Sequence, residues 1–220
     1  MTAMHIYKIP RVSYECAHSW QRERVDLRHA GLVGDALVLL EHPSTYTCGR
    51  ATSAEHLPQP AWLQGRSVHV VEIERGGSVT YHGPGQLVGY PIIDLRERGR
   101  DVHRYLRDLE DILIAALRLM GVEGTRREGL TGVWVGEEKI AAIGIHVSRW
   151  ITSHGFALNI APNLDFFHAM RPCGLSGDQV TSLEKALGHV VERDVVEASI
   201  IEATKMIWQV ELTVEAMSEL

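Results

Sequence analysis

The sequence has few of the features that mark membrane, secreted or nucleic-acid-binding proteins. No apolar run is long enough to span a bilayer, and the amino-terminal segment MTAMHIYKIPRV lacks the apolar stretch of a secretion signal. The formal net charge is −6 and no long basic run occurs, which argues against nucleic acid as the main partner because phosphate binding needs clustered Lys and Arg. We therefore expect a cytoplasmic protein that binds neither membranes nor nucleic acid.

Motifs for disulfides, metals and nucleotides are missing as well. The cysteines Cys16, Cys48 and Cys173 are widely spaced and form no C-x-x-C pair, so they predict neither a disulfide framework nor a cysteine-rich zinc site. Twelve histidines are present, but no H-E-x-x-H or comparable ligand spacing occurs, and we assign no metal. Neither a P-loop nor a G-x-G-x-x-G fingerprint is found, so we expect no nucleotide and no other cofactor.

The pattern of apolar residues predicts a sheet backed by helices. The 220 residues are enough to bury a core, and no linker forces a division, so we expect one domain over residues 1–220. Period-two or apolar runs predict strands at 5–9, 36–40, 68–74, 87–95, 132–135, 139–147 and 155–160, and helical periodicity predicts helices at 14–29, 101–120 and 195–210. This order favours an α/β (α+β) fold with a mixed sheet over a regular βαβ alternation.

The most informative segment is RGGSVTYHGPGQLVGYPIID, residues 75–94, where five glycines and two prolines interrupt a strand-like pattern. Glycine is used where the backbone needs positive φ or another group must come close, and Pro84 between Gly83 and Gly85 predicts a tight turn. A glycine-rich hairpin is the simpler interpretation, but the density of glycine favours a binding wall. Polar side chains that this wall can present are Arg75, Tyr81, His82 and Gln86.

Two residues are candidates for chemistry. Cys173 lies in a loop-like Arg-Pro-Cys-Gly sequence, where a thiol is more accessible than the inert, buried cysteine that we expect at Cys16 and Cys48. Only four of the 22 basic residues are lysine, and one of them, Lys139, opens an apolar strand. A desolvated lysine can lose its proton or stabilise a thiolate, which arginine cannot do in the same way. The alternative for Lys139 is a strand-end lysine that extends into water.

Together these motifs resemble those of the lipoyl(octanoyl) transferases. The resemblance rests on RGG-x-x-TYHGPGQ at 75–86, the strand around Lys139, SHGFALN at 153–159 and PCG at 172–174, in that order, and covers roughly residues 37–183. It implies a fold similar to that of biotin- and lipoate-protein ligases, with a mixed, largely antiparallel sheet flanked by helices.

The resemblance also implies an activity, the first step of endogenous lipoate biosynthesis. Such an enzyme takes octanoyl (or lipoyl) from acyl carrier protein onto a cysteine as a thioester. It then passes the acyl group to a lysine ε-amine on the lipoyl domains of 2-oxoacid dehydrogenases or on the glycine cleavage H protein.

Roles for individual residues follow from the same resemblance. Cys173 is expected to be the nucleophile, and Lys139 is expected to lower its pKa and to act as general acid and base. Small residues in the wall are expected to leave room for a straight acyl chain. The residues expected to bind the substrate are Arg75, Gly76, Gly77, Ser78, Val79, Thr80, Tyr81, His82, Ala142, Ile143, Gly144, Gly155, Phe156 and Ala157.

Two other functions remain open from the sequence. An ATP-dependent lipoate or biotin ligase has the same kind of fold but needs basic residues for phosphates and does not need Cys173. A non-catalytic protein that binds lipoyl domains needs neither Cys173 nor Lys139, so the presence of both argues against it.

Overall fold

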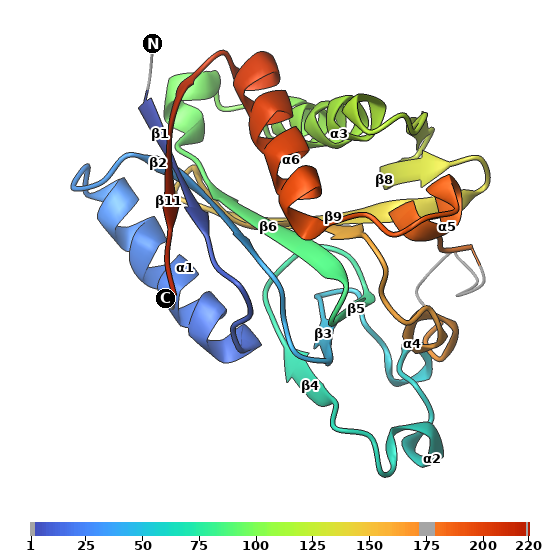
Figure 1. The fold of residues 1–220 in the computed structure, drawn as a ribbon. Coiled ribbons are helices and arrows are strands. Elements are labelled where there is room, and N and C mark those ends of the chain that lie inside the picture. Colours follow the sequence, from blue (N-terminus) through green and yellow to red (C-terminus); the bar gives the residue numbers. More distant parts are fainter. Residues whose placement is uncertain (1–2, 172–178, 219) are drawn as a thin grey trace.

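The computed structural model describes residues 3–171, 179–218 and 220, and two β-sheets organise this part of the chain (Figure 1). The strands of the large sheet are β1 (Ala3–Lys8), β2 (Asp35–Leu40), β6 (Gln86–Ile92), β7 (Thr125–Arg127), β8 (Leu130–Val135), β9 (Glu138–Ser148), β10 (Ile151–Asn159) and β11 (Glu211–Ala216). They lie in the order β11-β1-β2-β6-β10-β9-β8-β7. β1 runs parallel to β2 and β11, and the other neighbouring pairs are antiparallel. The expected mixed, largely antiparallel sheet is confirmed.

Helices cover both faces of this sheet. The α-helices are α1 (Tyr14–His29), α2 (Pro60–Leu63), α3 (Val102–Leu119), α4 (Asp165–His168), α5 (Leu183–Leu187) and α6 (Arg193–Trp208), and two short 3-10 helices are η1 (Ala54–His56) and η2 (Leu95–Arg98). In Figure 1, α3 and α6 lie together on one side of the sheet and α1 lies on the other. None of the helices in the described ranges is long and apolar enough to cross a membrane.

The largest apolar core lies under α3 and α6. Leu109, Leu113 and Leu117 of α3 are fully buried in a cluster that also contains Leu87 and Leu158 from the central strands. The helix begins where the Asp101 side chain accepts a hydrogen bond from the backbone N–H of Arg104. It ends before Gly121, whose φ of +79° fits the left-handed position that follows many helices. The amphipathic stripe therefore predicted this helix to within one residue at each end.

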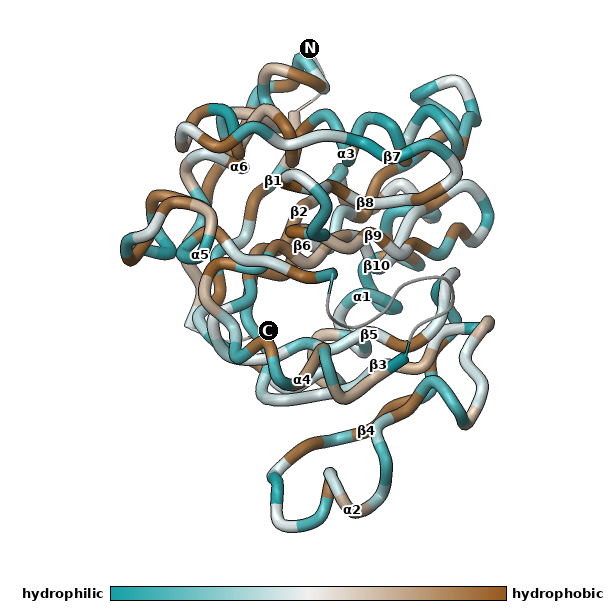
Figure 2. Tube along the Cα trace, turned by 90° about the vertical axis from the view of Figure 1, so that its right-hand side faces the viewer, coloured by the Kyte–Doolittle hydropathy of each residue, from teal (hydrophilic) through white to brown (hydrophobic). Residues whose placement is uncertain are grey.

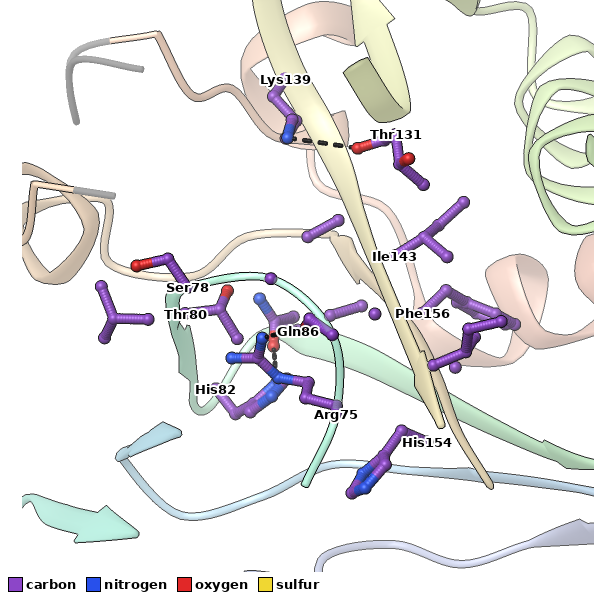
Figure 3. A pocket seen from close by; sticks show the side chains of 18 of the residues that line it. Arg75, Ser78, Thr80, His82, Gln86, Thr131, Lys139, Ile143, His154 and Phe156 are labelled. Atoms are coloured by element: carbon purple, nitrogen blue, oxygen red, sulfur yellow. Dashed lines mark hydrogen bonds between the residues drawn. The ribbon is translucent and has the colours of Figure 1, made fainter. Parts of the chain in front are cut away.

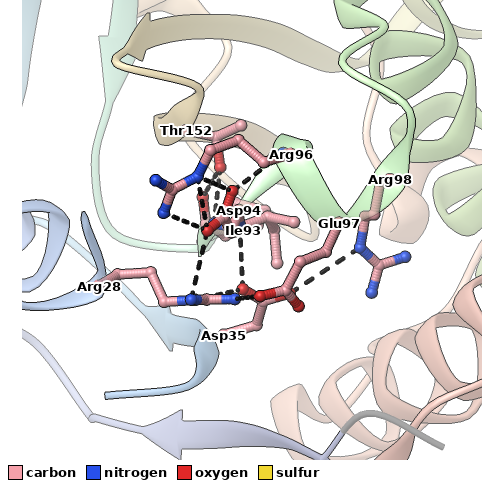
Figure 4. Close-up of polar contacts among 9 residues, drawn as sticks. Arg28, Asp35, Ile93, Asp94, Arg96, Glu97, Arg98 and Thr152 are labelled. Atoms are coloured by element: carbon pink, nitrogen blue, oxygen red, sulfur yellow. Dashed lines mark hydrogen bonds and ion pairs between the residues drawn. The ribbon is translucent and has the colours of Figure 1, made fainter. Parts of the chain in front are cut away.

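Helix α1 is anchored to the opposite face by a buried ion-pair network (Figure 4). The Arg28 guanidinium lies 2.9 Å from Oδ1 of Asp35, 3.3 Å from Oδ2 of Asp94 and 2.8 Å from Oε1 of Glu97. Asp94 is also paired with Arg96 at 2.6 Å. Because Arg28 and both aspartates are buried, removal of the arginine would leave uncompensated charge in the interior.

The small sheet lies to one side of the large one, and it carries the first half of the glycine-rich segment. Its strands β3 (Thr45–Cys48), β4 (His69–Glu72) and β5 (Val79–His82) are ordered β4-β3-β5, with β3 parallel to β4 and antiparallel to β5. In Figure 2, this sheet and α4 lie below the large sheet and α2 lies farthest from it. β3 falls in the segment 41–64, which the prolines make loop-like in sequence, and this strand was not predicted.

Candidate functional site

A cavity of about 430 Å³ lies between the small sheet and strands β9 and β10 of the large sheet (Figure 3). Pockets of this size suit small organic ligands. The structure brings together around it most of the residues that the sequence singled out: Arg75, Gly76, Gly77, Ser78, Val79, Thr80, His82, Lys139, Ala142, Ile143, Gly144, Gly155, Phe156 and Ala157. Three segments that are far apart in the chain therefore share one wall.

The pairing of β9 with β10 explains how two of these segments meet. In this antiparallel pair, Ala142 lies opposite Ala157 and Gly144 lies opposite Gly155. Residues directly opposite each other in such a pair lie about 5 Å apart, so the four small residues form one patch on the sheet.

Other parts of the protein occupy the space that a side chain at Gly144 or Gly155 would need. A Cβ atom at Gly155 would lie 2.2 Å from the carbonyl oxygen of Gly89, and one at Gly144 would lie 3.0 Å from Cδ of Arg75. Glycine at 155 is thus required by the approach of β6 to β10. Glycine at 144 leaves room for the Arg75 side chain, which differs from the expectation that both positions make room for an acyl chain.

Tyr81 is the one predicted wall residue that does not line the cavity. Val79, Thr80 and His82 of β5 line the cavity, whereas Tyr81 packs elsewhere. Its ring stacks on Phe166 with centroids 4.6 Å apart, and its hydroxyl lies 3.0 Å from Oγ of Ser44. The packing of Tyr81 in the core of the small sheet corrects the prediction that it lines the acyl site.

Arg75 is a buried cation held by backbone oxygens. Its Nη2 donates to the carbonyl oxygen and to Oγ1 of Thr47 at 2.8 and 3.0 Å, and its Nη1 donates to the carbonyl oxygen of Gly76 at 2.9 Å. Burial lowers the pKa of Arg75, but the group remains charged because arginine is effectively never deprotonated. The loop itself is tied to β9 by a hydrogen bond from Gly76 N to the Ile145 carbonyl. A fixed positive charge therefore faces the cavity.

A chain of hydrogen bonds links His82 to the far end of the cavity. The Gln86 amide nitrogen donates to Oδ1 of Asn159 at 2.9 Å, so the Gln86 oxygen is left to accept from Nδ1 of His82 at 2.9 Å. Asn159 in turn donates to the carbonyl oxygen of Thr181. Burial lowers the pKa of His82 to about 3, so the ring is neutral. Gln86 N also closes the predicted turn by donating to Gly83 O.

Lys139 lies at the opposite end of the cavity from His154 (Figure 3). Its Nζ donates to the Thr131 carbonyl at 3.4 Å and lies 4.7 Å from the centroid of the Trp134 ring. Of the described residues, none offers it a carboxylate within ion-pair distance. Burial lowers the pKa of Lys139 to about 8, so both protonation states are populated near neutral pH.

Cys173, the predicted nucleophile, lies outside the described residues, but both neighbouring parts of the chain are placed. Before it, Arg171 N donates to the His56 carbonyl, and Met170 lines the cavity. After it, Val180 lines the cavity, and the Gln179 carbonyl accepts from Lys139 N at 2.8 Å.

Several cavity residues carry no recognisable signal in the sequence. Tyr14 comes from α1, Tyr90 from β6, His154 and Asn159 from β10, and all of them reach the cavity only because these elements cross. Gln86, which the sequence named among the polar residues of the wall, lines the cavity as expected, whereas His154 and Asn159 belong to the SHGFALN motif but were not among the predicted binding residues. The aromatic residues looked like ordinary core residues.

Comparisons with known proteins point to one family. Residues 13–205 match the family described as the lipoyl protein ligase A/B catalytic domain. An octanoyltransferase of Gloeobacter violaceus is 53% identical over 75% of this chain and 73% of its own length. An octanoyltransferase of Syntrophotalea carbinolica is 45% identical over 90% of this chain and 91% of its own length.

Solved structures share the fold at low sequence identity. The crystal structure of lipoate-protein ligase A bound with ATP has a TM-score of 0.83 at 14% identity, over 100% of this chain and 90% of that one. At this identity the likeness shows the fold alone.

Proposed function

The chain belongs to the octanoyltransferases of the lipoyl protein ligase A/B catalytic domain family, and we propose that it carries the octanoyl group as a thioester on Cys173. The protein is an acyltransferase that acts in protein lipoylation. The proposed donor is octanoyl acyl carrier protein, and the proposed acceptors are lysines on lipoyl domains.

One observation carries this assignment of roles. The backbone N–H of Lys139 donates to the Gln179 carbonyl, and the Lys139 carbonyl accepts from the backbone N–H of Thr181, so Lys139 pairs with the chain that follows Cys173. The Lys139 side chain lines the cavity. Five residues lie between Cys173 and Gln179, and one lies between Arg171 and Cys173. These hydrogen bonds attach the chain that follows Cys173 to the backbone of Lys139, and they support the proposal that Lys139 serves Cys173.

In the first half-reaction, the Cys173 thiolate attacks the thioester carbonyl of the donor. A new carbon–sulfur bond forms, the bond to the carrier sulfur breaks, and the carrier thiolate leaves and takes up a proton. A free cysteine has a pKa of about 8.5, so little thiolate exists at pH 7 unless a cation stabilises it. Protonated Lys139 supplies such a cation and the proton for the leaving group.

In the second half-reaction, the lysine amine of the acceptor attacks the Cys173 thioester. An amide bond forms, the carbon–sulfur bond to Cys173 breaks, and the amine loses a proton. Neutral Lys139 takes that proton, which returns the site to its starting state. Ala142 and Ala157 offer the acyl chain small apolar side chains, and the positive charge of Arg75 also faces the cavity.

The experiment follows the acyl group by intact mass. The wild-type protein, mixed with octanoyl acyl carrier protein in the absence of ATP, is expected to gain one octanoyl group and to pass it to a lipoyl domain. Cys173→Ser is expected to gain none. Cys16 on α1 is exposed, in contrast to the burial expected from the sequence, and Cys16→Ser is expected to behave as wild type.

Two results would contradict the proposal. An unchanged octanoyl adduct on Cys173→Ser would assign the nucleophile elsewhere, and a strict requirement for ATP would favour the ligase alternative.

A further inference from the structure

Three side chains from distant parts of the sequence meet behind the cavity. His18 comes from α1, Glu74 precedes the glycine-rich segment, and His154 comes from β10. One nitrogen from each histidine and one carboxylate oxygen lie within 4.8 Å of one another. Within this group, Nε2 of His18 lies 3.1 Å from Oε1 of Glu74.

His154 has a buried ring nitrogen with no partner among the described residues. The residue is only 2% exposed, and its Nδ1 lies 3.3 Å from the hydroxyl of Tyr14, while its Nε2 makes no hydrogen bond. An unsatisfied buried polar atom costs about 1–3 kcal/mol, so a partner for this atom is expected. When Nδ1 donates to the Tyr14 hydroxyl, Nε2 carries the free lone pair, as in metal-ligating histidines.

The distances fit a shared metal ion. Zinc binds histidine nitrogen and carboxylate oxygen at about 2.0–2.1 Å, which places two ligand atoms of a tetrahedral site about 3.3 Å apart. The 3.1 Å between Nε2 of His18 and Oε1 of Glu74, a hydrogen bond in the structure, is close to this value, and all three ligand atoms lie within 4.8 Å of one another. Two imidazoles on one tetrahedral ion have ring centroids about 5 Å apart, and those of His18 and His154 are 5.6 Å apart.

We propose that His18, Glu74 and His154 bind a divalent metal ion of the zinc class, with Nε2 of each histidine and the carboxylate as ligands. Two histidines and one carboxylate are a known zinc ligand set that leaves one position open. The open position would face a second cavity of about 220 Å³, which His18 and Glu74 also line. Tyr14 would act as the outer partner of His154.

The ion would join α1, the start of the glycine-rich segment and β10 at one point. Glu74 adjoins Arg75, and His154 itself lines the larger cavity, so the site would fix one end of the proposed acyl wall. The inference goes beyond acyl transfer and does not depend on it, because it rests on these three side chains alone.

The test titrates the chelator-treated full-length protein with zinc alone, by calorimetry. One equivalent is expected to bind, and Co²⁺ is expected to give the absorption of a four-coordinate site without a thiolate-to-metal band. His18→Ala and Glu74→Gln are expected to weaken zinc binding by at least about 10- to 100-fold. Loss of a residue that only hydrogen-bonds to a metal ligand already has an effect of this size. The control His103→Ala removes an exposed histidine on α3 and is expected to bind zinc as wild type does.

Folding and the cysteine are controlled separately. Zinc is expected to raise the melting temperature of the wild type and of His103→Ala but not of His18→Ala, whose melting temperature without zinc should equal that of the wild type. Cys173→Ser is expected to keep the site. The proposal is overturned if the wild type binds no zinc, if His18→Ala and Glu74→Gln bind it as tightly as the wild type, or if Cys173→Ser loses it.

Discussion

Replacement of Lys139 by arginine is expected to separate the two half-reactions. Burial lowers the pKa of Lys139 from 10.5 to about 8. At pH 7 about a tenth of its side chains are therefore neutral, against about 0.03% for an ordinary lysine, so burial multiplies the available base about 300-fold. Arginine keeps the positive charge but supplies no neutral form. Lys139→Arg should thus retain much of the thiolate stabilisation and lose the proton acceptor.

The expected magnitude follows from the proton-transfer step. Formation of the octanoyl-enzyme is expected to slow by less than about tenfold in Lys139→Arg, because the cation is kept and the leaving carrier thiolate can take its proton from water instead of Lys139. Transfer from the preformed octanoyl-enzyme to a lipoyl-domain lysine is expected to slow by about 10²–10⁴-fold, the usual contribution of a general base. Both rates are measured in single-turnover experiments by intact mass.

The pH dependence sharpens the test. The ratio of wild-type to variant rates in the second half-reaction cancels the titration of the acceptor amine, because both proteins use the same acceptor. With a pKa of about 8 for Lys139, this ratio is expected to rise about 50-fold from pH 6 to pH 8 and to level off above about pH 9. Lys185→Arg, at an exposed lysine that pairs with Glu138, is the matched control and should match the wild type. A ratio that does not change with pH, or a variant rate within about threefold of the wild type, would refute a base role for Lys139.

Three further predictions concern stability, measured as the free energy of unfolding in urea. Arg28→Met removes the close counter-charge of the buried Asp35 carboxylate and is expected to cost about 3–5 kcal/mol. Gly155→Ala places a methyl carbon 2.2 Å from a backbone oxygen of β6 and is expected to cost about 1–3 kcal/mol. Burial lowers the pKa of His42 to about 4 and of His82 to about 3, so below pH 6.5 the unfolded chain binds protons that the folded protein does not. Stability is therefore expected to be highest above that pH and to fall by about 2 kcal/mol per histidine between pH 6.5 and pH 5.

Each of these changes has a matched control. Arg22→Met removes an exposed arginine from the same helix, and Gly34→Ala adds a methyl group whose nearest neighbour would lie at 3.7 Å. Either control is expected to change stability by less than about 1 kcal/mol. For the loss of stability at acid pH, His82→Gln is expected to reduce the fall in the free energy of unfolding between pH 6.5 and pH 5. His103→Gln, the control, is expected to leave that fall unchanged. Equal effects of a variant and its control would show that burial is not the cause.

The sequence predicted long elements well because their periodicity is local. Helix α1 occupies the predicted residues 14–29, and β8, β9 and β10 follow the predicted meander. Strand β3 was missed because four residues between prolines and turns carry too little periodicity. Tyr81 was wrongly predicted to line the acyl site, since its packing on Phe166 depends on a contact far away in the chain.

The sequence by itself determined which motifs this protein carries: the glycine-rich segment, the isolated Lys139, the SHGFALN strand and the loop of Cys173. Glycine in these motifs is typical of positive φ or of a close approach between backbones, and lysine is a cation whose pKa burial can lower. Only the tertiary structure decided what lies beside what. The pairing of β9 with β10 joins the two small-residue segments, and Gly89 and Arg75 fill the space that glycine leaves. The crossing of α1 with β10 brings His18 to His154, and the chain just before the glycine-rich segment adds Glu74. These contacts join residues far apart in the chain, and no local pattern encodes such distances.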